Sequence, residues 1–147
     1  MKKIMGLDYG DARTGVAISD LLCSIVGSTT VIPSRNREKA IADIVRLVKE
    51  NQVGEIVVGL PRNMDGSEGD RAKACRDFAM SLEKMLENIP VELCDERSST
   101  VLAHTYLNIA DVRGKKRKKT VDAVAAVIIL ESYLSFRKNS GKANNEI

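Results

Sequence analysis

The sequence predicts a single α/β domain, with a mixed β-sheet that carries helices on both of its faces. Two patterns predict this fold: a β-hairpin opens the chain, and helical and strand patterns then alternate. The composition agrees, since the 147 residues are 44% hydrophobic and 29% charged. A chain of this length buries about 70% of its unfolded surface, so it needs no disulfide or structural metal to fold.

The first part of the sheet is predicted as three consecutive strands. Residues 4–8 are largely apolar, turn-forming residues occupy 9–13, and residues 14–19 form a second strand, which favours an antiparallel hairpin. Residues 28–32 are rich in β-branched side chains, and Pro33 ends this third strand.

Helices and strands are expected to alternate after the third strand. The expected elements are helices over 37–52, 68–87, 99–107 and 120–137, strands over 55–60 and 91–94, and a basic loop over 108–119. Ser34 or Asn36 can cap the first helix, and Thr120 can cap the last. The predicted domain covers residues 1–138, and the polar residues 139–147 are expected to form a flexible tail.

The positive charge is concentrated in one short segment. The net charge is +3, and six basic residues stand within seven positions, so the rest of the chain carries a net −3. These six are Arg113, Lys115, Lys116, Arg117, Lys118 and Lys119. The segment is either a docking site for a polyanion or a solvated loop.

Membrane and secreted classes are not indicated. The longest apolar run, residues 123–130, is too short to span a bilayer, and Asp8 interrupts the apolar stretch that follows the N-terminal lysines. The three cysteines, Cys23, Cys75 and Cys94, form no CxxC pair, so they predict neither a zinc site nor a disulfide framework. A cytoplasmic location is therefore expected.

Acidic residues stand where predicted elements end or begin. Asp8 closes the first strand, Asp95 and Glu96 follow the last, and Asp122 lies in the first turn of the predicted last helix. Ligands gather at strand ends in open α/β sheets, so these acids can converge. Carboxylates with a single histidine in the chain suit Mg²⁺ or Mn²⁺.

Each acid also has an ordinary structural explanation. Asp8 can serve as a turn residue before glycine, and Asp122 can complement the positive end of its helix. Glu96 can form a common ion pair with Arg97 or Arg13. The sequence leaves these alternatives open for each acid taken alone.

Two loops have the composition of anion-binding loops. Residues 10–15 (GDARTG) turn tightly and carry Arg13, and residues 60–69 (LPRNMDGSEG) place Arg62 and Asn63 just before a helix. Glycine-rich turns and helix N-termini favour phosphate. Both loops can equally be simple connections.

Four segments of the chain form a recognisable set: GLDYG at 6–10, VGLPRNMDGSEG at 58–69, DERSST at 95–100 and KKTVDAVAAVIILESY at 118–133. Together they resemble the YqgF nuclease family. They occur in the family's order, and the resemblance extends to about Leu134. The family comprises proteins described as pre-16S rRNA nucleases or as Holliday-junction-resolvase-like. The resemblance implies a ribonuclease H-like fold, in which a three-stranded antiparallel meander is joined by two parallel strands.

The resemblance also implies the site. Asp8, Glu96 and Asp122 would be the catalytic acids that hold one or two Mg²⁺ or Mn²⁺ ions. It also implies substrate contacts from Arg13, Arg62, Asn63 and Arg97. The basic segment directly precedes the predicted helix that carries Asp122, so its residues Lys115, Lys116, Arg117 and Lys118 are further candidates for contacts with substrate phosphates. Ser98 departs from the family pattern, in which leucine is usual. Related enzymes use a fourth acid, for which Asp95 and Asp11 are the candidates.

The expected function is metal-dependent hydrolysis of phosphodiester bonds, by endo- or exonuclease action, most concretely at the 5′ end of pre-16S rRNA. The alternatives are resolution of four-way DNA junctions and catalytically silent nucleic-acid binding. ATP-binding proteins with a similar first loop need two domains, for which 147 residues are too few. Because only 3% of the residues are aromatic, the protein is expected to recognise the backbone and shape of the nucleic acid rather than to stack on its bases. It is expected to act as a monomer or a homodimer.

Overall fold

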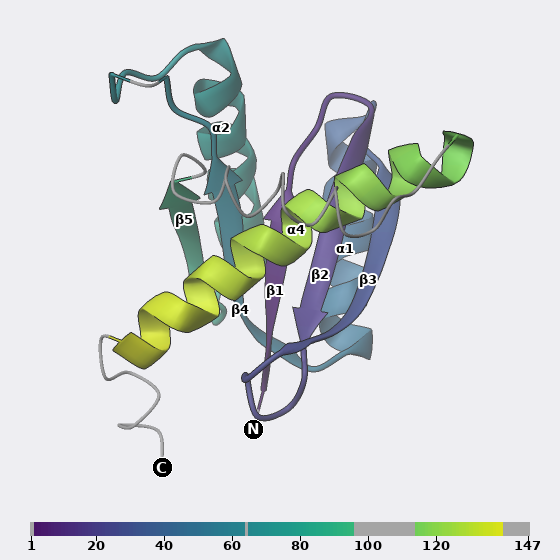
Figure 1. Cartoon of the computed structure of the whole chain (residues 1–147), viewed down its shortest axis with the longest axis vertical. Coiled ribbons are helices and arrows are strands. Elements are labelled where there is room, and N and C mark those ends of the chain that lie inside the picture. The colour runs from purple at the N-terminus through teal and green to yellow at the C-terminus, as the bar shows by residue number, and fades with distance from the viewer. Residues whose placement is uncertain (1, 64, 96–113, 140–147) are drawn as a thin grey trace.

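The computed structural model describes residues 2–63, 65–95 and 114–139, and of residues 114–123 it describes the backbone (Figure 1). Its elements are β1 (Lys3–Asp8), β2 (Arg13–Ser19), β3 (Val26–Pro33), α1 (Arg37–Glu50), β4 (Val53–Leu60), α2 (Asp70–Met85), β5 (Val91–Asp95) and α4 (Gly114–Asn139). The helix predicted over 99–107 and the tail predicted over 139–147 fall on residues outside the described ranges, apart from Asn139 at the end of α4.

The strands form one five-stranded sheet in the order β3-β2-β1-β4-β5. β1 pairs antiparallel with β2, and β2 pairs antiparallel with β3, which makes the predicted meander. β4 runs parallel to β1, and β5 runs parallel to β4. The mixed sheet predicted from the sequence is therefore confirmed.

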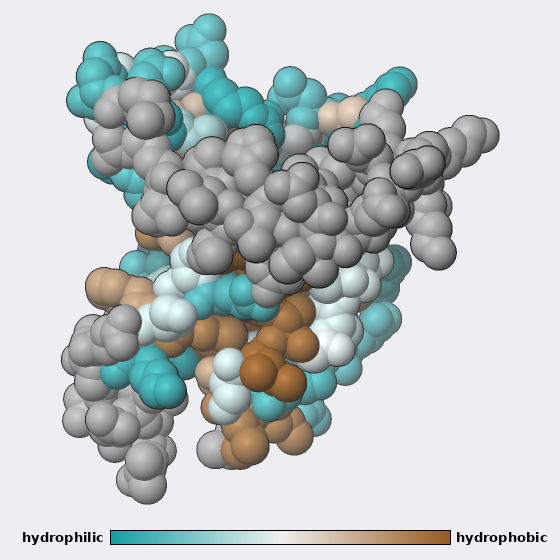
Figure 2. Space-filling model, in the orientation of Figure 1, coloured by the Kyte–Doolittle hydropathy of each residue, from teal (hydrophilic) through white to brown (hydrophobic). Residues whose placement is uncertain are grey.

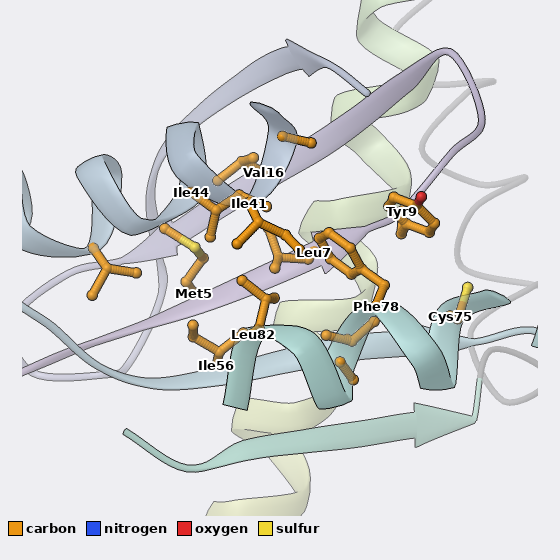
Figure 3. Close-up of a cluster of buried hydrophobic side chains, with 14 of the residues drawn as sticks. Met5, Leu7, Tyr9, Val16, Ile41, Ile44, Ile56, Cys75, Phe78 and Leu82 are labelled. Carbon is orange, nitrogen blue, oxygen red and sulfur yellow. The ribbon is translucent and has the colours of Figure 1, made fainter. Parts of the chain in front are cut away.

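Helices cover both faces of the sheet, as predicted. α4 crosses one face diagonally, while α1 and α2 lie against the other (Figure 1). Met5, Leu7 and Tyr9 of the β1 segment join the core under α1 and α2, where Phe78 and Leu82 meet them (Figure 3). Ile4 packs on the opposite face in the core under α4. Successive residues of β1 thus alternate between two cores.

The predicted helices begin close to their expected positions in the first half of the chain. The Asn36 side chain caps α1, because its Oδ1 accepts a hydrogen bond from the Lys39 backbone N–H at 3.1 Å. Cys75 is buried in the core of α2, but Cys23 and Cys94 are partly exposed. None of the helices in the described ranges is long and apolar enough to cross a membrane.

The predicted start of the last helix is wrong. α4 begins at Gly114 rather than Thr120, so the basic residues from Lys115 to Lys119 belong to the helix and not to a loop. Lysine and arginine are good helix formers, and neither glycine nor proline interrupts residues 115–120. Asp122 consequently stands in the third turn of α4, beyond the reach of the helix N-terminal dipole.

α4 lies unusually close to the central strand at Gly6. A Cβ atom built on Gly6 would lie 2.8 Å from the Cβ of Leu130 and 3.1 Å from the backbone oxygen of Ala126. Ala126 and Leu130 are completely buried, one helical turn apart. Gly6 therefore allows the backbone of α4 to pack almost directly on β1.

A polar cluster fastens the carboxyl-terminal half of α4 to β4. The Tyr133 hydroxyl donates a hydrogen bond to Glu55 Oε2, and Arg137 Nε lies 3.9 Å from Glu55 Oε1. Arg137 and Tyr133 are 5% and 6% exposed. Burial, and then the nearby Glu55 carboxylate, raise the pKa of Tyr133 above its ordinary value of 10.0.

Gly6→Ala is expected to lower the free energy of unfolding by about 1–3 kcal/mol, because the added methyl group displaces α4 from β1. Gly27→Ala is the matched control, since a Cβ on this β3 glycine would make only ordinary contacts, the nearest at 3.4 Å. The control should stay within about 0.5 kcal/mol of the parent in urea denaturation. Equal stability of the two variants would contradict the close contact.

Tyr133→Phe is expected to cost about 1–3 kcal/mol near neutral pH, because Glu55 loses its hydrogen-bond donor. The raised pKa means that the folded state retains the phenol proton when the unfolded state loses it. The stabilisation by Tyr133 is therefore complete below pH 10 and decreases as the pH rises beyond it. Denaturation of both proteins from pH 7 to 11 measures this, and a stability difference that does not narrow at high pH would refute it.

Candidate active site at the carboxyl edge of the sheet

The carboxyl ends of three parallel strands meet at one edge of the sheet (Figure 1). β1 ends there with Asp8, β4 with Leu60 and β5 with Asp95. Asp8 is partly buried, and it follows Ile4 and Gly6 on the face that α4 covers. The structure thus places the Asp8 carboxylate on the α4 side of this edge.

The register of the strands distinguishes the other candidates at this edge. Leu93 packs on the α1–α2 face and Cys94 on the α4 face, so Asp95 continues on the face opposite to Asp8. Asp95 is therefore a poor candidate for a fourth acid beside Asp8. Arg13 stands four residues before Ala17 in β2, so the two side chains point to the same face of the sheet. Ala17 belongs to the core under α4, which puts Arg13 on the same face as Asp8.

The other two predicted acids can be placed only in part. Asp122 stands in α4 one helical turn before Ala126, the residue whose carbonyl oxygen lies close to Gly6. Its side chain, those of Lys115, Lys116, Arg117 and Lys118, and the residues Glu96 and Arg97 lie outside what the structure describes. Within the described ranges no three His, Cys, Asp or Glu side chains form a metal-binding group.

The turn that follows Asp8 is held by neighbouring elements. The Ser34 hydroxyl donates to the Gly10 carbonyl oxygen, and the Ser34 N–H donates to the Ala12 carbonyl oxygen at 2.9 Å. From α2, Arg71 Nη2 donates to the Tyr9 carbonyl oxygen. Side-chain donors from two separate parts of the chain therefore fix the backbone of this turn.

Arg71 also contacts the second candidate for a fourth acid. Its Nη1 lies 3.3 Å from Asp11 Oδ1, and the Asp11 side chain is 94% exposed. A carboxylate so exposed and paired with a guanidinium is not arranged as a metal ligand beside Asp8.

Asn63 organises the loop that precedes α2. Its backbone N–H donates to the Ser67 carbonyl oxygen at 2.9 Å, and its side-chain Nδ2 donates to Ser67 Oγ at 3.0 Å. The Ser67 hydroxyl and N–H in turn donate to Asp65 Oδ1. Asn63 therefore stabilises the conformation of this loop through its hydrogen bonds to Ser67. Its predicted contact with substrate stays a prediction.

A carboxylate between two arginines connects this loop to α2. Arg76 binds Glu68 through two hydrogen bonds of 2.6 Å, and Arg62 Nη2 lies 3.4 Å from Glu68 Oε2. The hydrogen bonds from Arg76, helped by the charges of both arginines, hold the pKa of Glu68 below its ordinary value.

Arg62 is held loosely by comparison with Arg76. Its one ion pair is a long contact, and its buried Nε has no hydrogen-bond partner among the described residues. Its side chain is 32% exposed. The guanidinium is therefore only partly buried at the carboxyl edge of β4, and the prediction that it contacts substrate stays a prediction.

Sequence reasoning did not find Ser34, Glu68, Arg71 and Arg76 as parts of this site. Ser34 and Arg71 act on backbone carbonyls that lie 24 and 62 positions away, and no local pattern encodes such a contact. The pairing of Glu68 with Arg76 spans eight positions across a helix start, which is also outside the usual helical spacings.

Comparison with known proteins places the fold. RuvC from Thermus thermophilus, solved in complex with Holliday junction substrate, superposes with a TM-score of 0.62 at 11% identity, covering 95% of this chain and 98% of that chain. The fowlpox virus resolvase, solved with Holliday junction DNA, gives a TM-score of 0.62 at 10% identity, covering 91% and 97%. The fold is therefore that of the ribonuclease H-like resolvases, as the resemblance implied.

Sequence comparison identifies the family. A curated relative from Halothermothrix orenii, named "Putative pre-16S rRNA nuclease", is 50% identical over 135 residues, which cover 92% of this chain and 96% of the relative. A relative of the same name from Clostridioides difficile is 45% identical over 138 residues, covering 94% and 97%. The family model RuvX, described as Holliday junction resolvase, matches residues 2–136. The chain therefore belongs to the RuvX family of nucleases.

Proposed function

We propose that this nuclease hydrolyses phosphodiester bonds with the help of Mg²⁺ or Mn²⁺, and that its substrate is precursor 16S rRNA. The observation that carries the proposal is the position of Asp8. This carboxylate ends the central strand on the face crossed by α4, and Gly6 brings the helix that contains Asp122 close to the same strand.

The donor chemistry at this edge suits a hard divalent cation. Asp8 provides a partly buried carboxylate, and we propose Glu96 and Asp122 as the remaining protein ligands. When bound, one or two such ions lower the pKa of a bound water and stabilise the leaving oxygen of the phosphodiester. Carboxylates on a strand end and on a packed helix are held more rigidly than ligands on loops.

Arginines would position the nucleic-acid backbone against these acids. Arg62 is partly exposed at the end of β4, and Arg13 lies on the face of Asp8. We propose that Arg62, Arg13 and Arg97 contact substrate phosphates, with Asn63 shaping the loop. The first turns of α4 would add further phosphate contacts, which carry no sequence information, through Lys115, Lys116, Arg117 and Lys118.

The names of the relatives support precursor rRNA as the substrate, at identities of 42–50% over nearly the whole chain. A four-way DNA junction is the second candidate, because the RuvX model is described as a resolvase and the fold matches RuvC bound to such a junction. Paired cuts in a junction would require a dimer. Action on precursor rRNA implies a cytoplasmic enzyme.

Asp8→Asn is expected to reduce cleavage at least about 100-fold, because a metal ligand that supports several kcal/mol of transition-state stabilisation is lost. Cleavage of labelled RNA in Mg²⁺ or Mn²⁺ measures this, with chelator as a second negative control. Asp43→Asn is the matched control, since Asp43 is a partly buried carboxylate that pairs with Arg46 on α1. Full activity in Asp8→Asn would refute the metal assignment.

Precursor 16S rRNA with its 5′ leader should be cleaved faster than a four-way DNA junction of equal nucleotide concentration. Both substrates are tested with wild type and Asp8→Asn under the same metal and salt conditions. Paired, Asp8-dependent cuts in the junction without RNA cleavage would establish the resolvase function instead. Binding of either substrate without cleavage in any divalent metal would establish a silent binding module.

A further inference from the structure

The β1–β2 turn, residues 9–12, directly follows Asp8. Asp8 is the last residue of β1, where it pairs with Gly15 of β2, and the pairing of β1 with β4 reaches Leu7, the residue before it. Its other neighbour is Tyr9, the first residue of the turn. How firmly Tyr9 is held therefore contributes to the direction of the Asp8 side chain.

α2 holds Tyr9 in two ways. The Tyr9 ring stacks on Phe78 with ring centroids 4.0 Å apart, and the Tyr9 side chain is almost fully buried. Figure 3 shows both side chains at one end of the core under α1 and α2. The Tyr9 carbonyl oxygen accepts a hydrogen bond from Arg71 Nη2. Because neighbouring strand residues point to opposite faces, anchoring Tyr9 toward α2 keeps Asp8 directed toward α4.

Arg71 is suited to this task by the shape of its guanidinium. Nη2 reaches the Tyr9 carbonyl while Nη1 reaches Asp11 at 3.3 Å, so the two ends of the fork bind the start and the middle of one turn. Lysine is a single point donor and cannot hold both groups in this planar arrangement. The turn is also too tight for a Cβ at Gly10, which would collide with the Arg13 carbonyl oxygen.

An arginine at this edge can alternatively be a substrate contact, since the Arg71 side chain is 42% exposed. Its contacts argue against that role, because both terminal nitrogens already bind the turn. Arg62 differs in this respect, since among the described residues it makes a long ion pair with Glu68 and its Nε has no hydrogen-bond partner. A positioning residue and a phosphate contact also predict different measurements.

We propose that Arg71 is a positioning residue that clamps the β1–β2 turn and thereby holds the Asp8 carboxylate ready for a divalent cation. The proposal rests on the proposed function, in which Asp8 is a metal ligand. Residues that orient a ligand typically change metal affinity by about 10–100-fold when they are removed. Arg71 would act on the metal through Tyr9 and Asp8, without touching the metal or the nucleic acid.

The test compares Arg71→Gln and Arg71→Lys with wild type and with Arg46→Gln. Arg46 is the matched control, since it is an exposed arginine of α1 that also pairs with carboxylates, those of Asp43 and Glu50. Mn²⁺ binding without nucleic acid is measured by electron paramagnetic resonance, and circular dichroism reports on folding. RNA cleavage is measured over a range of metal and RNA concentrations.

Arg71→Gln should weaken Mn²⁺ binding about tenfold or more, with the KM for RNA unchanged at saturating metal. Arg71→Lys should recover only part of the loss, and Arg46→Gln should behave as wild type. If Arg71→Gln raises the KM for RNA and leaves Mn²⁺ binding unchanged, Arg71 is a phosphate contact and the proposal is overturned. If Arg71→Gln binds Mn²⁺ more weakly than wild type but wild type itself cleaves no RNA, the clamp is supported and the proposed nuclease action is overturned. Absence of Mn²⁺ binding by wild type would overturn both.

Discussion

The close packing of α4 on β1 at Gly6 is the constraint on which the rest of this structure depends. A helix can approach a sheet this closely only where the strand presents no side chain, and at Gly6 a single methyl group would already meet Leu130 and the Ala126 backbone. The contact lies two residues before Asp8 on β1 and one helical turn after Asp122 on α4. One backbone contact therefore sets the relation between the two elements that carry these acids.

Polar contacts at both ends of the sheet add to this packing and fix the positions of the helix and of the loops at the candidate site. In the carboxyl-terminal half of α4, Tyr133 and Arg137 both contact Glu55 of β4, and these contacts help to fix the position of the helix on the sheet. At the opposite edge, Ser34 and Arg71 fix the turn after Asp8, and the pairing of Glu68 with Arg76 fixes the loop that carries Arg62. The hydrophobic cores thus define the layers of the fold, and the polar contacts define the positions of the side chains at the candidate site. Figure 2 shows the outer surface on the α4 side, where hydrophilic and hydrophobic residues of the described ranges lie side by side.

Much of the fold follows from short-range patterns in the chain. Residues 4–8 and 14–19 predict the first hairpin because an apolar strand, a turn and a second strand follow directly. The helix at 37–50 is predictable from its apolar spacing and from Asn36, whose capping hydrogen bond the structure confirms. The start of α4 was not predictable in the same way, because a run of lysines is compatible with a solvated loop and with a helix.

The sequence by itself determined the fold class, the family, and Asp8 as the acid at the end of the central strand. These features depend on local periodicity and on short motifs whose order along the chain can be read directly. Only the tertiary structure decided which face each residue of the edge occupies, and it separates Asp95 from Asp8 although both end parallel strands. It also decided that Arg71 binds the turn after Asp8 and that Arg62 pairs with Glu68. The physical reason is that strand register and long-range side-chain contacts join residues tens of positions apart, and no pattern within a short window contains that information.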